Sequence, residues 1–269
     1  MARPARVVIV QMDHDADAPG ENVAYVRQAV ERYRDRDLVV FPELALHGHS
    51  LAEAPRSEKH AAVSATPDEE VDALHDLIAR CRANVVFGAI VERGGRMFNL
   101  GVYSDGARRV SYAKTHVHWS EGFDAGREFP VFDTPLGRMG MLICFDAAFP
   151  EVPRLLALQG ARVIVNLSAI PASFPLEVVH RRLVACSVHN LTWTLFANRR
   201  GRGFLGGSAI VDPKGEIVAV AGERDETLEA TIDVDAADLW RSQEPALDFR
   251  RPDLYAMLSK EARVAETPK

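Results

Sequence analysis

The chain has 269 residues, of which 47% are hydrophobic and 26% are charged, a composition typical of one large globular domain or two small ones. Its formal charge of −6 argues against a nucleic-acid partner, because such proteins normally present a basic domain or stripe. The longest stretch without a charged side chain, 183–198, is too short and too polar to span a bilayer, so no membrane segment is expected.

The first half of the chain predicts a β-α-β unit, then a second helix and a meander of short strands. The second helix is signalled by a capping box that runs from Thr66 to Glu69, ahead of an apolar face that ends at Cys81. Turns rich in Gly and Asp separate the strands that follow. The predicted elements are a strand at 7–12, a helix at 23–33, a strand at 38–41, a helix at 66–81, and strands at 85–91, 98–103 and 109–113.

The second half repeats the alternation of strand and helix. The predicted elements are a hairpin at 135–137, a strand at 139–143, a helix at 151–159, a strand at 163–166, a helix at 176–189, and strands at 192–197, 208–211, 216–220 and 228–234. No linker or fixed-period repeat divides the chain, so one α/β domain over 1–269 is expected. About a dozen strands are too many for one open sheet, which predicts two sheets face to face with helices outside.

Three polar side chains follow directly after predicted strands, where ligand sites of α/β sheets form. They are Glu43, Lys114 and Cys144: a base, a cation and a nucleophile. Each has an ordinary structural interpretation, because a free cysteine is often a buried hydrophobe and strand-end lysines and glutamates are often solvated. The other two cysteines, Cys81 and Cys186, lie on helices and are interpreted as packing residues. Three cysteines cannot all pair, and the apolar run at 7–10 is too short for a signal peptide, so a cytoplasmic location is predicted.

Three ordered segments of the chain resemble the signature segments of the nitrilase superfamily of carbon–nitrogen hydrolases. They are Phe41-Pro42-Glu43-Leu44, Tyr112-Ala113-Lys114-Thr115-His116-Val117, and Gly140-Met141-Leu142-Ile143-Cys144-Phe145-Asp146-Ala147-Ala148-Phe149-Pro150-Glu151. The similarity continues to Asn198-Arg199-Arg200-Gly201, to the turn at 212–215 and to 250–255. It therefore covers nearly the whole chain.

The resemblance implies a four-layer α-β-β-α sandwich with two mixed sheets, and a Glu-Lys-Cys triad that needs no metal or organic cofactor. Glu43, Lys114 and Cys144 match that triad. Glu121 stands where a second glutamate, a fourth catalytic residue, is common in the family, although the glycine after it comes about two residues early. The resemblance also implies homo-oligomers. The apolar side chains of the tail 235–269 are predicted to take part in the contacts of a dimer.

The residue types suit acyl transfer from a small-molecule amide. A thiol with an ordinary pKa of about 8.5 needs a base or a cation to attack at neutral pH. Glu43 would take the thiol proton, Lys114 would stabilise the thiolate and the oxyanion, and a thioester would form and be hydrolysed. Phe145-Asp146 after the nucleophile resembles the amidase and carbamoylase branches, whereas nitrilases tend to have Trp-Glu there. Amides or N-carbamoyl compounds are therefore favoured over nitriles.

The substrate-binding residues are predicted to be Trp119, Phe145, Phe149 and Ser168, which lie near strand ends. A carbamoylase would also need a cation for a substrate carboxylate, and the candidates for it are Arg181, Arg182 and Arg199.

Other functions stay open at this point. The pairs His47/His49 and His116/His118, with Asp146, suggest a metal-dependent hydrolase, but each pair follows a strand and no H-E-x-x-H helix is present. A binding protein is disfavoured because none of the three matched residues is replaced. An acyltransferase that uses the same acyl-enzyme is not excluded by the sequence.

Overall fold

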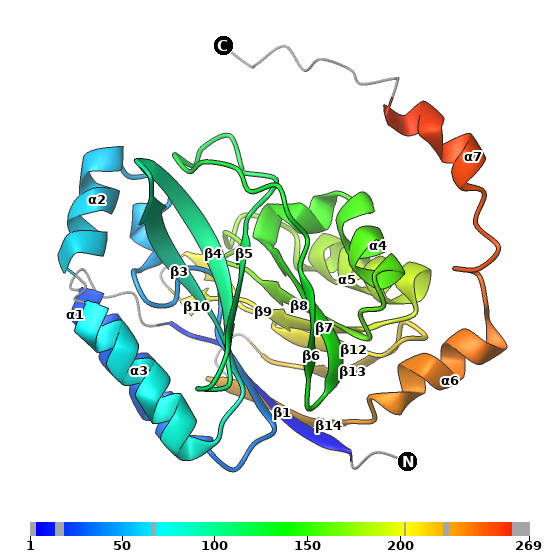
Figure 1. The fold of residues 1–269 in the computed structure, drawn as a ribbon, viewed down its shortest axis with the longest axis horizontal. Coiled ribbons are helices and arrows are strands. Elements are labelled where there is room, and N and C mark those ends of the chain that lie inside the picture. Colours follow the sequence, from blue (N-terminus) through cyan, green and yellow to red (C-terminus); the bar gives the residue numbers. More distant parts are fainter. Residues whose placement is uncertain (1–3, 14–18, 66–67, 202, 223–225, 260–269) are drawn as a thin grey trace.

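A computed structural model describes residues 4–13, 19–65, 68–201, 203–222 and 226–259. Two six-stranded sheets pack face to face (Figure 1), in the orders β14-β1-β2-β3-β4-β5 and β13-β12-β9-β8-β7-β6. Three neighbouring strands of each sheet are parallel, and antiparallel strands flank them on both sides. The sheets are therefore mixed, as predicted.

The first sheet is built from β1 (Ala5–Val10), β2 (Leu38–Val40), β3 (Val85–Arg93), β4 (Arg96–Ser104), β5 (Arg109–Ala113) and β14 (Thr227–Ile232). The second is built from β6 (Val131–Thr134), β7 (Gly137–Ile143), β8 (Val163–Leu167), β9 (Trp193–Ala197), β12 (Ala209–Val211) and β13 (Ile217–Val220). A separate two-stranded ribbon pairs β10 (Arg200–Gly201) with β11 (Phe204–Leu205).

Helices cover the outer face of each sheet, which completes the predicted α-β-β-α sandwich. They are α1 (Pro19–Arg32), α2 (Arg56–Ala65) and α3 (Asp68–Cys81) on the side of the first sheet, and α4 (Glu151–Leu158) and α5 (Leu176–Asn190) on the side of the second. After the last strand come α6 (Asp235–Gln243) and α7 (Pro252–Tyr255).

Alternation along the strands divides the core into layers. Val7 and Ile9 of β1 point into the core between the sheets, whereas Val8 and Val10 pack under α1 and α3. On the other side Ile164 of β8 packs with α4, in a smaller outer core. Alternate side chains of such a strand are buried in two different cores, one on each face of the sheet. Successive residues of the strand are therefore apolar, and the sequence shows an uninterrupted hydrophobic stretch.

The elements that the sequence did not predict are mostly short or polar, namely α2, α6, α7, β10 and β11, whereas β6 is the first strand of the predicted hairpin. Helix α2 has Arg, Ser, Glu, Lys and His at its start, so its apolar face is weak. Thr66 and Pro67 of the predicted capping box lie outside the described residues, as do residues 260–269 of the tail. None of the helices in the described ranges is both long and apolar enough to cross a membrane.

Buried His47 gives a first prediction, on acid stability. Its Nδ1 accepts a hydrogen bond of 3.1 Å from the backbone N–H of Ile90, and burial lowers its pKa to about 4. The unfolded chain, with a histidine pKa of about 6.5, binds this proton first, so stability should fall as the pH drops from about 6.5 to 4, by on the order of 3 kcal/mol at most. His47→Asn keeps an acceptor and should lose part of this dependence in urea unfolding at stepped pH.

The matched control for that measurement is His189→Asn, which replaces an exposed imidazole and should keep the wild-type pH dependence. Parallel stability curves for wild type and His47→Asn over the same range would contradict the prediction.

Candidate active site

The three strand-end residues meet between the two sheets. Glu43 follows β2 and Lys114 follows β5 of the first sheet, whereas Cys144 follows β7 of the second. The Lys114 ammonium donates to Glu43 Oε1 at 2.8 Å and to Glu121 Oε1 at 2.7 Å, and Asn99 Nδ2 of β4 donates to the same Glu43 oxygen at 2.7 Å. The predicted residues Glu43, Lys114 and Glu121 thus form one buried, hydrogen-bonded group.

Charge fixes the protonation states of the pair at the centre of this group. Burial by itself raises the pKa of Glu43, but the Lys114 ammonium, His49 and the two hydrogen bonds to Oε1 hold that pKa below its usual range. Burial disfavours the Lys114 ammonium, but Glu43, Cys144 and Glu121 outweigh burial and raise its pKa. Glu43 is therefore a carboxylate and Lys114 a cation at neutral pH.

Glu121 has the opposite tendency to Glu43. Burial and the nearby Glu43 carboxylate raise its pKa to about 7, and Lys114 opposes them. Two carboxylates that share one ammonium are thus separated in pKa, a pattern typical of acid–base sites. The second oxygens of both, Glu43 Oε2 and Glu121 Oε2, are buried and have no hydrogen-bond partner among the described residues. Both oxygens can accept a donor from a bound molecule.

Cys144 lies at a sharp turn. Its φ is 48°, in the left-handed region that non-glycine residues rarely adopt, and it begins a short 3₁₀ turn, Cys144–Ala148. Burial and the Glu43 carboxylate raise the pKa of the Cys144 thiol, against Lys114 and the backbone N–H of Ala169, which donates toward its sulfur. The resting group is therefore a neutral thiol, and a thiol reacts as a nucleophile only after it loses its proton.

Asp146 anchors that turn. One carboxylate oxygen accepts from Tyr112 Oη at 2.7 Å and from the backbone N–H of Ile143 at 3.0 Å. The other accepts from Thr115 Oγ1 and from the backbone N–H of His116, both at 2.9 Å. Because Tyr112 and Thr115 flank Lys114 in the chain, this buried carboxylate joins the Cys144 turn on one sheet to the strand of Lys114 on the other.

The Glu43 loop is held just as closely. A Cβ added to Gly88 of β3 would stand 2.3 Å from the backbone nitrogen of Leu44, so only glycine lets the loop lie this close to the sheet. The buried Arg199 donates to the carbonyl oxygens of Glu43 at 3.2 Å and of Leu44 at 3.0 Å. Arg199 thus supports the loop. Of the other two cations considered for a substrate carboxylate, Arg181 pairs with Glu177 and Arg182 lies over Phe174.

Aromatic rings surround the Cys144 turn. Phe149 stacks on His116 with ring centroids 3.9 Å apart, and Phe145 meets Phe149 edge to face at 5.2 Å. Trp119 is 76% exposed and contacts Phe145 edge to face at 5.7 Å. Ser168, the fourth residue predicted to bind substrate, is buried and donates its hydroxyl to Asn166 at 3.0 Å. Its backbone precedes Ala169, whose N–H faces the Cys144 sulfur.

The histidines proposed as metal ligands make separate contacts. His47 accepts from the backbone of Ile90, His49 packs against Phe204, His116 bonds to Asp146, and His118 bonds to Ser120. Within the part of the chain that the structure describes, no three His, Cys, Asp or Glu side chains gather as a metal site would require. The metal-hydrolase alternative therefore gains no support from these residues.

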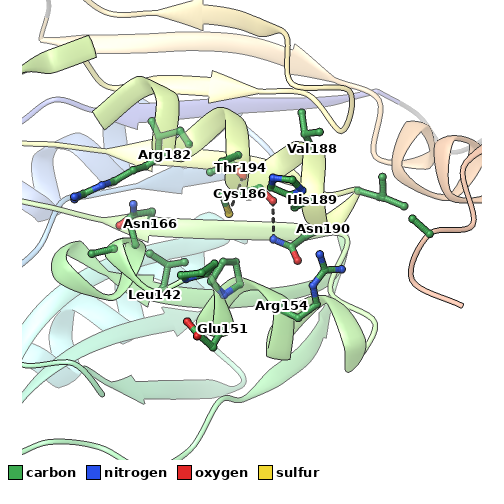
Figure 2. Close-up of a pocket in the computed structure, with 18 of the residues that line it drawn as sticks. Leu142, Glu151, Arg154, Asn166, Arg182, Cys186, Val188, His189, Asn190 and Thr194 are labelled. Carbon is green, nitrogen blue, oxygen red and sulfur yellow. Dashed lines mark hydrogen bonds between the residues drawn. The ribbon is translucent and has the colours of Figure 1, made fainter. Parts of the chain in front are cut away.

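A groove of about 900 Å³ lies on the far side of the turn, between α4, α5 and the C-terminal segment (Figure 2). The groove is lined by Ala147 and Ala148 of the turn and by Cys186 and Asn190 of α5. Burial raises the pKa of the Cys186 thiol to about 11, and Cys81 packs into the core between the first sheet and its helices. Both are packing residues, as predicted.

Comparison with known proteins places this arrangement in a family. The model of the carbon-nitrogen hydrolase family matches residues 6–242. The chain belongs to the carbon-nitrogen hydrolase family. It is an enzyme that acts on carbon–nitrogen bonds, and its resemblance to the nitrilase superfamily is confirmed.

Relatives of this hydrolase include both nitrilases and amidases by name. A nitrilase of Pyrococcus abyssi is 30% identical over 234 residues, which cover 82% of this chain and 86% of that one. The omega-amidase NIT3 of Saccharomyces cerevisiae is 26% identical over 95% of this chain and 96% of its own. A solved mutant of the amidase from Nesterenkonia sp. AN1 superposes with a TM-score of 0.80 at 20% identity, over 94% and 95% of the two chains. That last likeness shows the fold.

The structural roles of several residues around this site were not predicted from the sequence. Asn99 is a lone amide inside an apolar strand, and that isolation is a signal that was available. Asp146 was interpreted as the mark of a strand-to-turn break, as a marker of substrate branch and as a metal ligand, and its hydrogen bonds across the two sheets were not foreseen. Gly88 and Arg199 act through contacts between distant segments, which no local pattern in one sequence reveals.

Proposed function

We propose that this carbon-nitrogen hydrolase cleaves a primary amide or an N-carbamoyl compound through a thioester on Cys144, with Glu43, Lys114 and Glu121 as the other catalytic residues. The observation that carries the proposal is the pair of buried, unpartnered oxygens, Glu43 Oε2 and Glu121 Oε2. Buried acceptors without a partner are costly, by about 1–3 kcal/mol each, and they mark where a ligand's donors would bind.

The chemistry of those acceptors favours an amide over a nitrile. A terminal –NH₂ group has two N–H donors and can satisfy both carboxylate oxygens, whereas a nitrile nitrogen has none. An N-carbamoyl compound presents the same –NH₂ group. Amide and N-carbamoyl substrates thus both supply N–H donors for the two unpartnered oxygens, whereas a nitrile leaves both acceptors unpaired.

The first chemical step follows from the protonation states. The neutral Cys144 thiol gives its proton to the Glu43 carboxylate while its sulfur forms a bond to the carbonyl carbon. The carbonyl oxygen becomes an oxyanion, which the Lys114 ammonium and the backbone N–H of Phe145 stabilise. Glu43 then protonates the nitrogen, the C–N bond breaks, and ammonia leaves a thioester on Cys144.

Hydrolysis of the thioester reuses the same base. Glu43 takes a proton from water as its oxygen attacks the thioester carbon, and the carboxylic acid leaves as the thiol is restored. During the earlier acylation step, until ammonia leaves, Glu121 accepts from the –NH₂ group and orients it. These steps need neither a metal nor an organic cofactor. An acyltransferase would differ only in the acceptor, with an amine or hydroxylamine in place of water.

The named relatives support this reading without extending to this chain's substrate. One is an omega-amidase, and the solved Nesterenkonia mutant carries a covalent acetamide group at its active-site cysteine. Another is named a nitrilase, so the test of the proposal must compare turnover of an amide with turnover of a nitrile.

The nucleophile can be identified by mass spectrometry of the quenched reaction. An acyl adduct is expected on the Cys144 peptide, Cys144→Ala should have no measurable turnover, and Glu43→Gln should be slower by on the order of 10²–10⁴-fold because a general base is lost. Cys186→Ala is the matched control, since it removes a buried thiol outside the site and should keep activity. An adduct on Cys81 or Cys186 would refute the assignment.

Substrate preference is tested with one acyl group presented as amide and as nitrile. The amide should have a kcat/KM higher by about 10–100-fold, the cost of leaving one or two buried acceptors unpaired. Glu121→Gln should narrow this difference, because its amide replaces one of the acceptor oxygens by a donor. A higher kcat/KM for the nitrile would contradict the proposal, and product formation only with an added amine would favour an acyltransferase.

We also propose that the chain, a single domain, forms a dimer through its tail and the outer helices of the second sheet. Large apolar side chains are exposed there, and Figure 1 shows α7 standing apart from the sandwich. They are Leu155, Leu158, Val188, Leu239, Phe249, Leu254, Tyr255, Met257 and Leu258. Such a surface, beside an open groove, is typical of an interface between protein chains.

Light scattering at micromolar concentration tests this assembly. The mass should be at least twice the 29.6 kDa of one chain, and Leu254→Asp with Leu258→Asp should reduce it to one chain. Val218→Asp alters an exposed apolar residue on β13 and should leave the mass unchanged. A wild-type mass near 29.6 kDa would refute a stable dimer.

A further inference from the structure

Helix α2 carries a buried lysine that the proposed reaction does not use. Lys59 is completely buried, although lysines are almost never buried without a charged partner. Its ammonium donates to the carbonyl oxygen of Ala54 at 2.6 Å and lies 4.7 Å from the ring centroid of Phe123. One carbonyl and one aromatic ring compensate a buried ammonium only in part, so an anion is needed close by.

That anion is on the segment against which Lys59 packs. A Cβ added to Gly122 would stand 3.0 Å from Lys59 Nζ, so the ammonium touches the residue that follows Glu121. Burial lowers the pKa of Lys59, and among the charges that act on it the Glu121 carboxylate has the largest effect. Lys59 therefore contacts the residue after Glu121 from α2, whereas Lys114 reaches the Glu121 carboxylate from the end of β5.

Two further contacts tie the same segment to the start of α2. The backbone N–H of Gly122 donates to the carbonyl oxygen of Ala52 at 3.4 Å, and Arg56 pairs with Asp124 at 3.2 Å. Asp124 in turn donates its N–H to the carbonyl oxygen of Met97 on β4. The segment is thus held between α2 and the first sheet.

The local charges explain why a second cation belongs there. Lys114 is shared between Glu43 and Glu121, so the group of three carries a net negative charge when both carboxylates are ionised. The charged groups that shift the pKa of Glu121 are Glu43 after β2, Lys114 after β5 and Asp146 in the turn after β7. Glu121 in turn raises the pKa of Cys144 in that turn and of Lys59 on α2. Two of these groups are cations. Lys114 is also hydrogen-bonded to Glu43, and Lys59 has no hydrogen bond to Glu43 in the described structure.

We propose that Lys59 is a positioning residue for Glu121, which holds the Glu121 segment in place and supplies the second cation that keeps its carboxylate ionised for the substrate –NH₂ group. The role of the –NH₂ group rests on the proposed function; the effect on the ionisation of Glu121 does not. With Glu121 titrating at about pH 7, activity should rise with pH through that range, since the ionised form is the better acceptor.

The decisive variant is Lys59→Met, which keeps the length of the side chain and removes its charge. Carboxyl ¹³C NMR of glutamate-labelled protein follows the titration of Glu121 without substrate, and the signal is assigned by its loss in Glu121→Gln. The apparent pKa of Glu121 should rise by about one unit in Lys59→Met. The acid limb of the kcat/KM profile should move to higher pH by the same amount, with a smaller change in kcat/KM on the alkaline side.

Two variants separate charge from structure. Lys59→Arg keeps the charge and should restore the wild-type titration, and Arg56→Met loosens the contact with Asp124 while leaving Lys59 in place, so it should not move the titration. If Lys59→Met does not fold, Gly122→Ala crowds the ammonium at 3.0 Å and should shift Glu121 in the same direction.

An unchanged Glu121 titration in folded Lys59→Met would overturn the proposal, and so would an equal shift in Arg56→Met. Absence of amide hydrolysis in the wild type would instead refute the proposed function, and the NMR titration would still decide the role of Lys59.

Discussion

One buried ammonium between two carboxylates determines most of what is particular about this fold. Lys114 binds Glu43 and Glu121 at hydrogen-bond distance, and the side chains of all three are buried. Removing charges from water is expensive, and such a group persists only where geometry and further hydrogen bonds compensate. The surrounding structure supplies them: Asn99 on one carboxylate, Asp146 across the sheets, and the glycine and arginine that hold the Glu43 loop.

The two sheets have different tasks in this arrangement. The first sheet carries the charged group on the ends of β2 and β5, and the second presents the thiol at the end of β7. Their relative position is set by the apolar core between them and, at the site itself, by the Asp146 carboxylate that bonds to residues of both. A reactive geometry that spans two sheets therefore depends on side-chain packing over the whole interface, and preorganisation here is a property of the sandwich.

Much of this could be predicted from the sequence because the signals were local. Apolar runs predicted the strands, and the polar residues Glu43, Lys114 and Cys144 directly after them were predicted as site residues at strand ends. What could not be predicted depends on contacts between segments far apart in the chain. Gly88 looks like any strand glycine until the Glu43 loop lies on it, and Lys59 looks like a solvated helix lysine until α2 packs over the segment after Glu121.

Electrostatics also corrected one detail that residue types alone suggested. A lysine beside a cysteine predicts a stabilised thiolate, but burial and the Glu43 carboxylate outweigh Lys114 and keep the Cys144 thiol protonated. The cation is thus most useful later, when negative charge develops on the substrate oxygen. In the proposed mechanism, deprotonation is coupled to attack because burial and the Glu43 carboxylate keep the resting thiol protonated.

The backbone at Cys144 has a consequence for how such a protein can evolve. With a φ of 48°, the position suits glycine best, but glycine has no side chain on which to carry a thiol, and a side chain there costs about 1–3 kcal/mol. Under the proposed function, stability and reactivity are therefore opposed at a single residue, because replacing Cys144 by glycine would relieve the backbone strain and remove the proposed nucleophile. A descendant that no longer used the proposed reaction could replace Cys144 by glycine and gain the strain energy as stability. The cysteine is therefore expected to persist only while that activity is under selection.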